Sequence, residues 1–165
     1  MYVLVRHGHA GDKKLWDGDD AHRPLSGRGR QQAEGLVASL REAAPTRLVT
    51  SPYLRCRQTL EPMAQQLPLP LASWDLLRPE ADVRELDRWL ADPRLEGAVL
   101  CTHGETLNAL LDLWAGTRAL VRIGHGVTTG STQKGAAWIV TTDAEHTWVR
   151  YVRPLHIGPA ALARR

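Results

Sequence analysis

The sequence predicts an α/β fold, a three-layer α/β/α sandwich with a mostly parallel central sheet. Short apolar runs of strand length recur along the chain, and segments with apolar residues at helical spacing lie between them. This alternation is typical of a parallel sheet with helices on both faces. The 165 residues suit one domain covering residues 1–165, and we find no repeat or interdomain linker.

The first half of the chain is predicted to form two strands, each followed by a helix. The apolar run Tyr2–Val5 has the length of a buried strand and is too short to cross a membrane. A helix is expected from the N-cap Ser26 to about residue 42. The strand 47–50 leads into a second helix, for which Ser51 is the expected N-cap and Pro52 the first helical residue.

The second half is predicted to contain strands at 69–74 and 98–102, helices from Asp82 to Leu90 and from His103 to Gly116, and a hairpin of strands at 136–142 and 147–153. Asp82 and Glu85 have the spacing of a capping box. Gly116 suits the C-terminal end of a helix. Residues 117–134 are rich in Gly, Thr and Ser, and no element is assigned to them.

The composition is that of an ordinary globular protein, with 43% hydrophobic and 24% charged residues. A net charge of +3 and a pI near 9.2 are compatible with an anionic ligand, but no block of Lys and Arg indicates a nucleic-acid partner. The chain enters a strand directly, without a signal peptide or an apolar run of membrane-spanning length. Cys56 and Cys101 are too few for a disulfide framework. We therefore expect a cytoplasmic protein with no membrane partner.

Polar side chains follow three of the predicted strands and indicate a phosphate site. Arg6-His7-Gly8, the run from Ser51 to Arg55, and His103-Gly104 all stand at predicted strand ends, and such junctions can lie on one edge of a parallel sheet. Arginine binds phosphoryl oxygens through a planar fork and stays charged at physiological pH. A neutral imidazole can attack phosphorus, while a second, cationic imidazole can neutralise the transferring oxygens.

These motifs, in this order, resemble those of the histidine phosphatase superfamily, which has the phosphoglycerate mutase-like fold. The matching segments are Arg6-His7-Gly8, Ser51-x-x-x-Arg55-x-x-x-Thr59 and His103-Gly104. The resemblance implies that His7 is the nucleophile and becomes phosphohistidine. It implies a phosphate pocket made by Arg6, Gly8, Arg55 and His103, with His103 taking part in catalysis. It implies no metal and no organic cofactor.

Within the superfamily, the segments Arg6-His7-Gly8-x-Ala10 and Arg23-Pro24-Leu25-Ser26-x-x-Gly29 are similar to those of small SixA-type phosphohistidine phosphatases. They also resemble the phosphatase-like domain that follows a Nudix domain in some bacterial proteins, although this sequence contains no Nudix box. The resemblance places Arg23 at the pocket rim, where the alternative is a solvated loop arginine. A carboxylic acid usually protonates the leaving group in this family; Glu80 is our candidate, with Asp82 or no such residue as alternatives.

The expected activity is hydrolysis of a phosphohistidine protein or a small phosphoester through phospho-His7. The alternatives are a mutase that returns the phosphoryl group to substrate, a catalytically weak module that binds phosphorylated ligands, and a metal site formed by His7, His9 and His103. His125 could reach the pocket or lie on the surface, and His22 and His146 are expected to be exposed.

Overall fold

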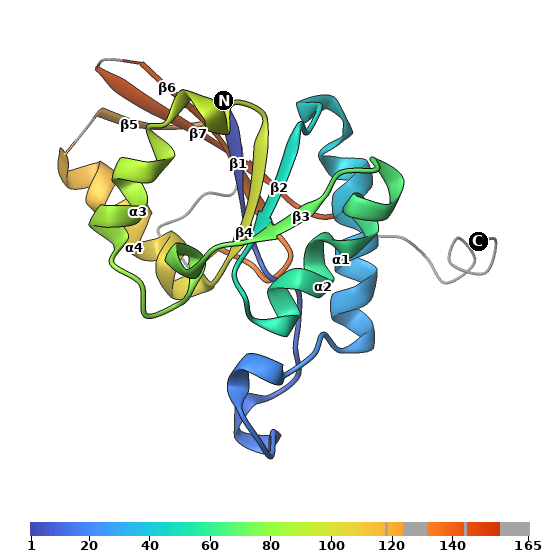
Figure 1. Ribbon diagram of the computed structural model, residues 1–165. Coiled ribbons are helices and arrows are strands. Elements are labelled where there is room, and N and C mark those ends of the chain that lie inside the picture. Colours follow the sequence, from blue (N-terminus) through green and yellow to red (C-terminus); the bar gives the residue numbers. More distant parts are fainter. Residues whose placement is uncertain (118, 124–131, 144, 156–165) are drawn as a thin grey trace.

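The structure is a computed structural model, and it describes residues 1–117, 119–123, 132–143 and 145–155. Its centre is a seven-stranded sheet in the order β3-β2-β4-β1-β6-β7-β5 (Figure 1). The strands are β1 (Tyr2–Arg6), β2 (Arg47–Thr50), β3 (Leu71–Ser73), β4 (Ala98–Thr102), β5 (Ala119–Ile123), β6 (Ala137–Thr142) and β7 (His146–Val152).

The sheet is mostly parallel, which confirms the prediction. β1 and β2 both pair in parallel with β4, β3 pairs in parallel with β2, and β5 pairs in parallel with β7. Only β6 runs against its neighbours β1 and β7, and the β6–β7 pair is the predicted hairpin. β5 lies in the region for which the sequence predicted no element.

Two helices cover each face of the sheet (Figure 1). The first pair is α1 (Gly27–Ser39) and α2 (Leu54–Gln66), and the second is α3 (Val83–Leu90) and α4 (Gly104–Thr117). Side chains of β1 alternate between the two faces, as strand geometry requires. Val3 and Val5 join the core beneath α1 and α2, whereas Tyr2 and Leu4 join the core beneath α3 and α4. The three-layer prediction is confirmed.

Several element boundaries differ from the predicted ones. α1 begins at its expected N-cap Ser26, whose side chain accepts the N–H of Gly29, but it ends at Ser39 and a 3₁₀ turn follows it. Asp82 caps α3 as predicted. The predicted N-cap Ser51 is wrong, because α2 starts only at Leu54 and the Ser51 hydroxyl is bonded to His103 instead.

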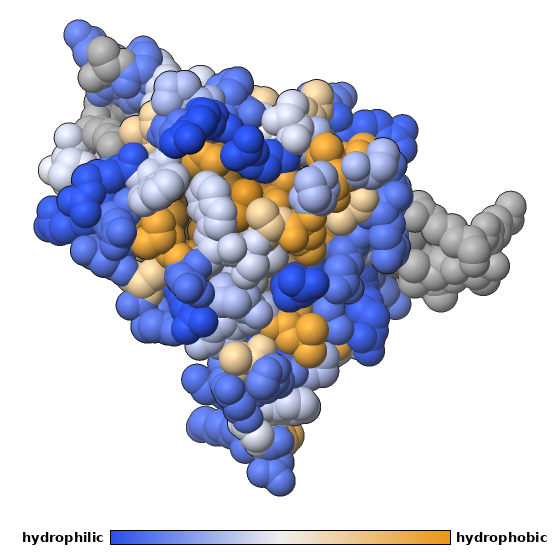
Figure 2. Space-filling model, in the orientation of Figure 1, coloured by the Kyte–Doolittle hydropathy of each residue, from blue (hydrophilic) through white to orange (hydrophobic). Residues whose placement is uncertain are grey.

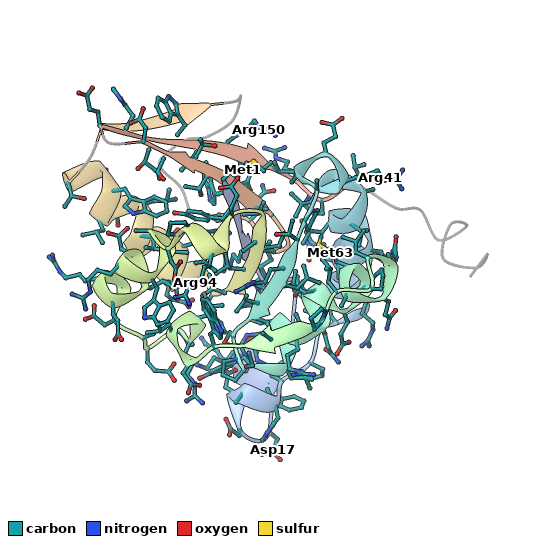
Figure 3. All side chains as sticks on the ribbon, turned by 45° about the horizontal axis from the view of Figure 1, so that its top comes forward. Met1, Asp17, Arg41, Met63, Arg94 and Arg150 are labelled. Carbon is teal, nitrogen blue, oxygen red and sulfur yellow. The ribbon has the colours of Figure 1, made fainter. Side chains whose placement is uncertain are left out.

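The segment between β1 and α1 projects from the body of the molecule, with Asp17 at its tip (Figures 1 and 3). It contains two 3₁₀ turns, η1 (Lys13–Leu15) and η2 (Asp20–His22), and its surface is mostly hydrophilic (Figure 2). A hydrogen bond from Arg55 of α2 to the carbonyl oxygen of Asp20 (2.7 Å) ties η2 to the sheet edge where β1, β2 and β4 end. This segment therefore borders the sheet edge at which β1, β2 and β4 end.

Cys56 and Cys101 are both buried and unpaired, as expected from the absence of a disulfide framework. In the part of the chain that the structure describes, no helix has the length and apolar character needed to cross a lipid bilayer.

Candidate active site

The two histidines come together because the strands that carry them are neighbours. His7 directly follows β1 and His103 directly follows β4, and the main-chain N–H of His7 donates to the carbonyl of Thr102 (3.0 Å). The two imidazole rings are edge to face, with centroids 5.3 Å apart. Both side chains are buried. Residues far apart in sequence thus form one cluster at the carboxyl edge of the sheet.

The hydrogen bonds of His7 fix which ring nitrogen is free to react. Nδ1 lies 2.8 Å from the carbonyl oxygen of Gly8, which can only accept, so Nδ1 carries the proton. Nε2 therefore holds the lone pair, and it accepts a hydrogen bond from Nε of Arg55 (3.3 Å). Burial, opposed by the Gly8 bond and reinforced by the charge of Arg55, lowers the pKa of His7 to about 3. His7 is a neutral nucleophile at pH 7.

His103 is held as the opposite tautomer. Its Nδ1 faces Nη2 of Arg55 (3.3 Å), which can only donate, and its Nε2 faces the Ser51 hydroxyl (3.0 Å). Burial lowers the pKa of His103 to about 2, with further contributions from the neighbouring His7 and Arg55. The expected cationic second imidazole is therefore a neutral one in this structure, because a buried ring beside an arginine does not take up a proton.

Arg55 and Arg23 are brought together by a residue that the sequence analysis did not single out. The carboxylate of Asp20 accepts from Nη2 of Arg55 (3.0 Å) and from Nε of Arg23 (2.8 Å). Both arginines are buried, and the guanidinium of Arg55 also stacks over the ring of Tyr53. Burial acts to raise the pKa of Asp20, but the hydrogen bond from Arg23 and the charge of Arg55 hold it below its ordinary value. Asp20 is therefore an ionised link between two cations.

Arg6 and Gly8 support the cluster from β1. Nη1 of Arg6 donates to the carbonyl of Thr132, and Gly104 packs so closely on the guanidinium that a Cβ there would lie 2.6 Å from Cζ. Gly8, which the resemblance places in the phosphate pocket, donates its N–H to Oγ1 of Thr59 (3.0 Å). The Gly8 atom that contacts His7 is the carbonyl oxygen, and this contact sets the tautomer of His7.

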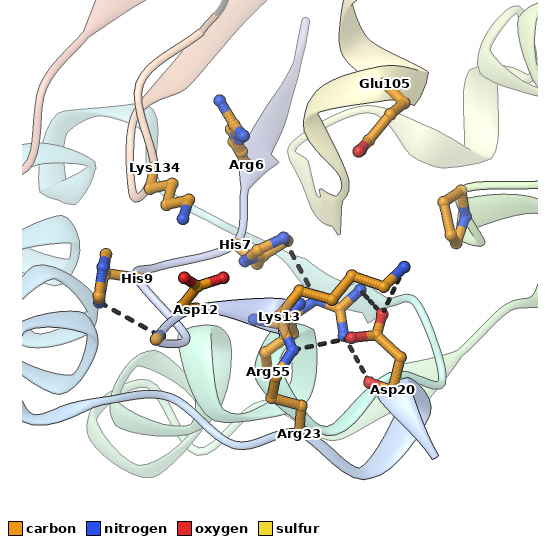
Figure 4. A pocket seen from close by; sticks show the side chains of 12 residues that line it. Arg6, His7, His9, Asp12, Lys13, Asp20, Arg23, Arg55, Glu105 and Lys134 are labelled. Carbon is orange, nitrogen blue, oxygen red and sulfur yellow. Dashed lines mark hydrogen bonds and ion pairs between the residues drawn. The ribbon is translucent and has the colours of Figure 1, made fainter. Parts of the chain in front are cut away.

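These residues surround an open pocket with a volume of about 500 Å³ (Figure 4). Its lining residues are Arg6, His7, His9, Gly11, Asp12, Lys13, Asp20, Arg23, Arg55, Pro79, Glu105 and Lys134. Five of them are arginines or lysines and three are carboxylates, so the pocket is positively charged and suits an anion. His103 is not among the lining residues; it is buried and contacts two residues that are, His7 and Arg55.

The two predicted candidates for the general acid lie away from the pocket lining. The side chain of Glu80 is 56% exposed and contacts Arg78 (3.7 Å) and the hydroxyl of Tyr53 (3.5 Å). Asp82 accepts the N–H of Arg84 (2.8 Å) as the cap of α3. The structure does not bring either carboxylate into the cluster around His7.

Five charged residues of the pocket lining were missed in the sequence: Asp12, Lys13, Asp20, Glu105 and Lys134. All but Glu105 lie in polar connecting segments without a pattern, where only the folded backbone decides what faces inward. Lys134 is positioned by the next residue, because the N–H of Gly135 lies 3.1 Å from the carbonyl oxygens of both Arg6 and His7. Glu105 could have been found from the sequence, because it stands two residues after His103, in the first turn of the helix that begins at the site.

Among the described residues, the remaining histidines do not form a metal site. Nδ1 of His9 is 2.8 Å from the hydroxyl of Ser26, and no cluster of three His, Cys, Asp or Glu suited to a metal ion occurs among the described residues. The side chain of His22 is 79% exposed and that of His146 is 39% exposed. His125 lies outside the described residues.

A family comparison agrees with this geometry. The family model of the histidine phosphatase superfamily, branch 1, matches residues 2–85, which include the first histidine and the Arg55 motif. The chain belongs to the histidine phosphatase superfamily. A curated relative from Mycolicibacterium smegmatis, named 8-oxo-(d)GTP phosphatase, is 38% identical over 158 residues. The match covers 92% of this chain and 48% of that protein, so the chain spans about half the length of the relative.

Solved structures of histidine phosphatases share the fold. The protein histidine phosphatase SixA, complexed with tungstate, matches with a TM-score of 0.71 and 22% identity over 98% of both chains. The mycobacterial glucosyl-3-phosphoglycerate phosphatase, complexed with VO3, matches with a TM-score of 0.63 and 15% identity over 95% of this chain and 98% of that one. These likenesses show the phosphoglycerate mutase-like fold that the sequence predicted.

Proposed function

We propose that this histidine phosphatase domain hydrolyses a phosphohistidine protein or a small phosphoester through a phospho-His7 intermediate, without a cofactor. The observation that carries the proposal is the state of His7: a buried, neutral imidazole whose Nδ1–H is tied to Gly8 and whose Nε2 lone pair meets Arg55. A nucleophile of this kind needs no base to remove a proton before it attacks.

In the proposed reaction, Nε2 of His7 attacks phosphorus and the bond to the leaving group breaks. The positive charge that develops on the ring is stabilised by the carbonyl of Gly8, which already accepts from Nδ1–H. Arg6, Arg23 and Arg55 bind the equatorial oxygens, and arginine suits this because its N–H groups form paired bonds to phosphate. Water then attacks the phosphoenzyme, releasing phosphate and restoring His7.

His103 acts as a positioning residue in this scheme. It accepts a hydrogen bond from Nη2 of Arg55, and the same guanidinium donates through Nε to His7. Ser51 in turn holds the other nitrogen of His103. This chain of contacts fixes the plane of Arg55 relative to the nucleophile, which supports transition-state binding without a charge on His103.

The proposal is tested by trapping the intermediate. Wild-type protein incubated with ³²P-labelled acetyl phosphate and quenched in alkali is expected to retain label that acid removes, as a phosphoramidate does. His7→Asn should retain none and should not turn over p-nitrophenyl phosphate. His22→Asn makes the same change at an exposed histidine and should be labelled as the wild type is. Label on His7→Asn contradicts the assignment, and phosphate binding without label or turnover in the wild type indicates a binding module instead.

A nucleoside triphosphate is a second candidate substrate. It is favoured by the two lysines of the pocket, Lys13 and Lys134, because they add two cations to the three arginines and suit additional phosphates (Figure 4). The relative named 8-oxo-(d)GTP phosphatase points in the same direction. If this candidate holds, Lys134→Ala lowers kcat/KM for GTP and 8-oxo-dGTP about tenfold or more while leaving p-nitrophenyl phosphate within about threefold, on the scale of one charge-assisted hydrogen bond. An equal loss for both substrates refutes it.

A further inference from the structure

The three carboxylates that line the pocket differ in what holds them. Asp20 is bridged by two guanidinium groups, 2.8 and 3.0 Å away. Asp12 accepts the N–H of Lys14 (2.9 Å) as the cap of η1. Glu105, in the first turn of α4, has no hydrogen-bond or ion-pair partner within the described part of the chain. Of the three, Glu105 is the one whose oxygens no described residue engages.

The packing of α4 explains why Glu105 faces the pocket. The helix starts at Gly104, which lies directly against the Arg6 guanidinium and leaves no room for a side chain. Glu105 follows Gly104 and is exposed, whereas the two residues after it, Thr106 and Leu107, are buried against the body of the protein. Figure 4 shows the Glu105 side chain extending from α4 towards the space beside His7 and Arg6. The carboxyl group thus enters the pocket on the wall opposite the projecting segment.

We propose that Glu105 is the proton donor for the leaving group. This inference rests on the proposed function and adds the acid that the reaction needs. As Nε2 of His7 bonds to phosphorus, the bond from phosphorus to the leaving oxygen breaks and the carboxyl proton of Glu105 passes to that oxygen. In the second step the carboxylate takes one proton from the attacking water, whose oxygen bonds to phosphorus while the bond to Nε2 breaks. Phosphate leaves, and Glu105 and His7 return to their starting states.

The other carboxylates are less suited to this task. Two guanidinium groups keep Asp20 ionised, and an acid that cannot hold a proton cannot donate one. Glu80 lies outside the pocket lining and is engaged by Arg78 and Tyr53.

A leaving-group series separates proton donation from a structural effect. We would measure kcat/KM for p-nitrophenyl phosphate, phenyl phosphate and an alkyl phosphate with the wild type, Glu105→Gln and the matched control Glu80→Gln. p-Nitrophenolate is a good leaving group and needs little help, whereas an alkoxide needs a proton. Glu105→Gln is expected to stay within about threefold of the wild type for p-nitrophenyl phosphate and to lose about 10²-fold or more for the alkyl ester. Glu80→Gln should leave the whole series unchanged.

Two results would overturn the proposal. One is a loss in Glu105→Gln that is the same for every ester, or no loss for any; the other is a graded loss in Glu80→Gln. Labelling of His7 is scored separately, since Glu105→Gln should still form phospho-His7 from acetyl phosphate, whose leaving group is a weak base. Failure of the labelling in the wild type therefore counts against the proposed function, and a flat ester series with labelling intact counts against Glu105 alone.

Discussion

Lowering the pH from 7 to 5 should destabilise this protein through two buried imidazoles. His7 and His103 have pKa values of about 3 and about 2 in the folded protein, whereas an exposed histidine in the unfolded chain has a pKa near 6.5. Because both are lowered on folding, protons bind the unfolded chain first. The stabilisation is therefore fully present above about pH 6.5 and is lost as the pH falls towards the folded values.

The size of the effect follows from this difference in proton binding. Between pH 7 and pH 5 each unfolded-state imidazole goes from mostly neutral to almost fully protonated, while the folded ring stays neutral. Each therefore removes about 2 kcal/mol from the free energy of unfolding, or about 4 kcal/mol for both. That is a large share of the ~5–15 kcal/mol by which a domain of this kind is stable.

Urea unfolding at pH 7 and pH 5 measures this, with His103→Gln as the test variant. His103→Gln removes one of the two titrating rings, so its loss between the two pH values should be about 2 kcal/mol smaller than that of the wild type. His22→Gln makes the same chemical change at an exposed position and should keep the wild-type difference. Equal pH dependence in the wild type and His103→Gln would show that burial does not hold the ring neutral, and the reasoning would be refuted.

Three further predictions concern close packing and charge around the pocket. Gly29→Ala places a Cβ 2.1 Å from a main-chain oxygen and should lower the unfolding free energy by about 1–3 kcal/mol, whereas Gly27→Ala, with open space around it, should be neutral or slightly stabilising by urea titration. Gly104→Ala should displace the Arg6 guanidinium and lower kcat/KM about tenfold or more while the far-UV spectrum is unchanged. Asp20→Asn removes the negative charge between two arginines, so vanadate should inhibit the variant at lower concentrations than it inhibits the wild type.

The layers of the fold could be predicted because they depend on local patterns. Apolar runs of strand length and helical periodicity are read directly from neighbouring residues, and both histidines were expected at strand ends for that reason. The partners of these histidines could not be read in the same way. Asp20 lies in a loop whose backbone is fixed by Arg55, far along the chain, so its link between two arginines exists only after folding.

The charge of the second imidazole shows a different limit. The sequence analysis predicted a protonated second imidazole, because a positive charge beside phosphate is favourable. A sequence alone does not show how far a side chain is removed from water. In the structure His103 is 1% exposed and accepts a hydrogen bond from Arg55, and both facts favour the neutral ring. The positive charge of the site is therefore supplied by guanidinium groups, which keep their charge when buried.

Ser51 connects these observations. As the N-cap of α2 it could add about 1 kcal/mol to helix stability, and the sequence favours that use because proline follows it. In the structure α2 begins at Leu54, three residues after Ser51. The Ser51 hydroxyl lies 3.0 Å from Nε2 of His103 and accepts only a long hydrogen bond, of 3.4 Å, from the N–H of Tyr53. With Nε2–H directed at Ser51, Nδ1 must present its lone pair to Arg55, so the tautomer of the second histidine is set at a helix start. The hydroxyl of Ser51, which could have capped α2, thus orients Arg55, and Arg55 contacts His7. The N-cap preference for serine therefore predicts the wrong start for α2.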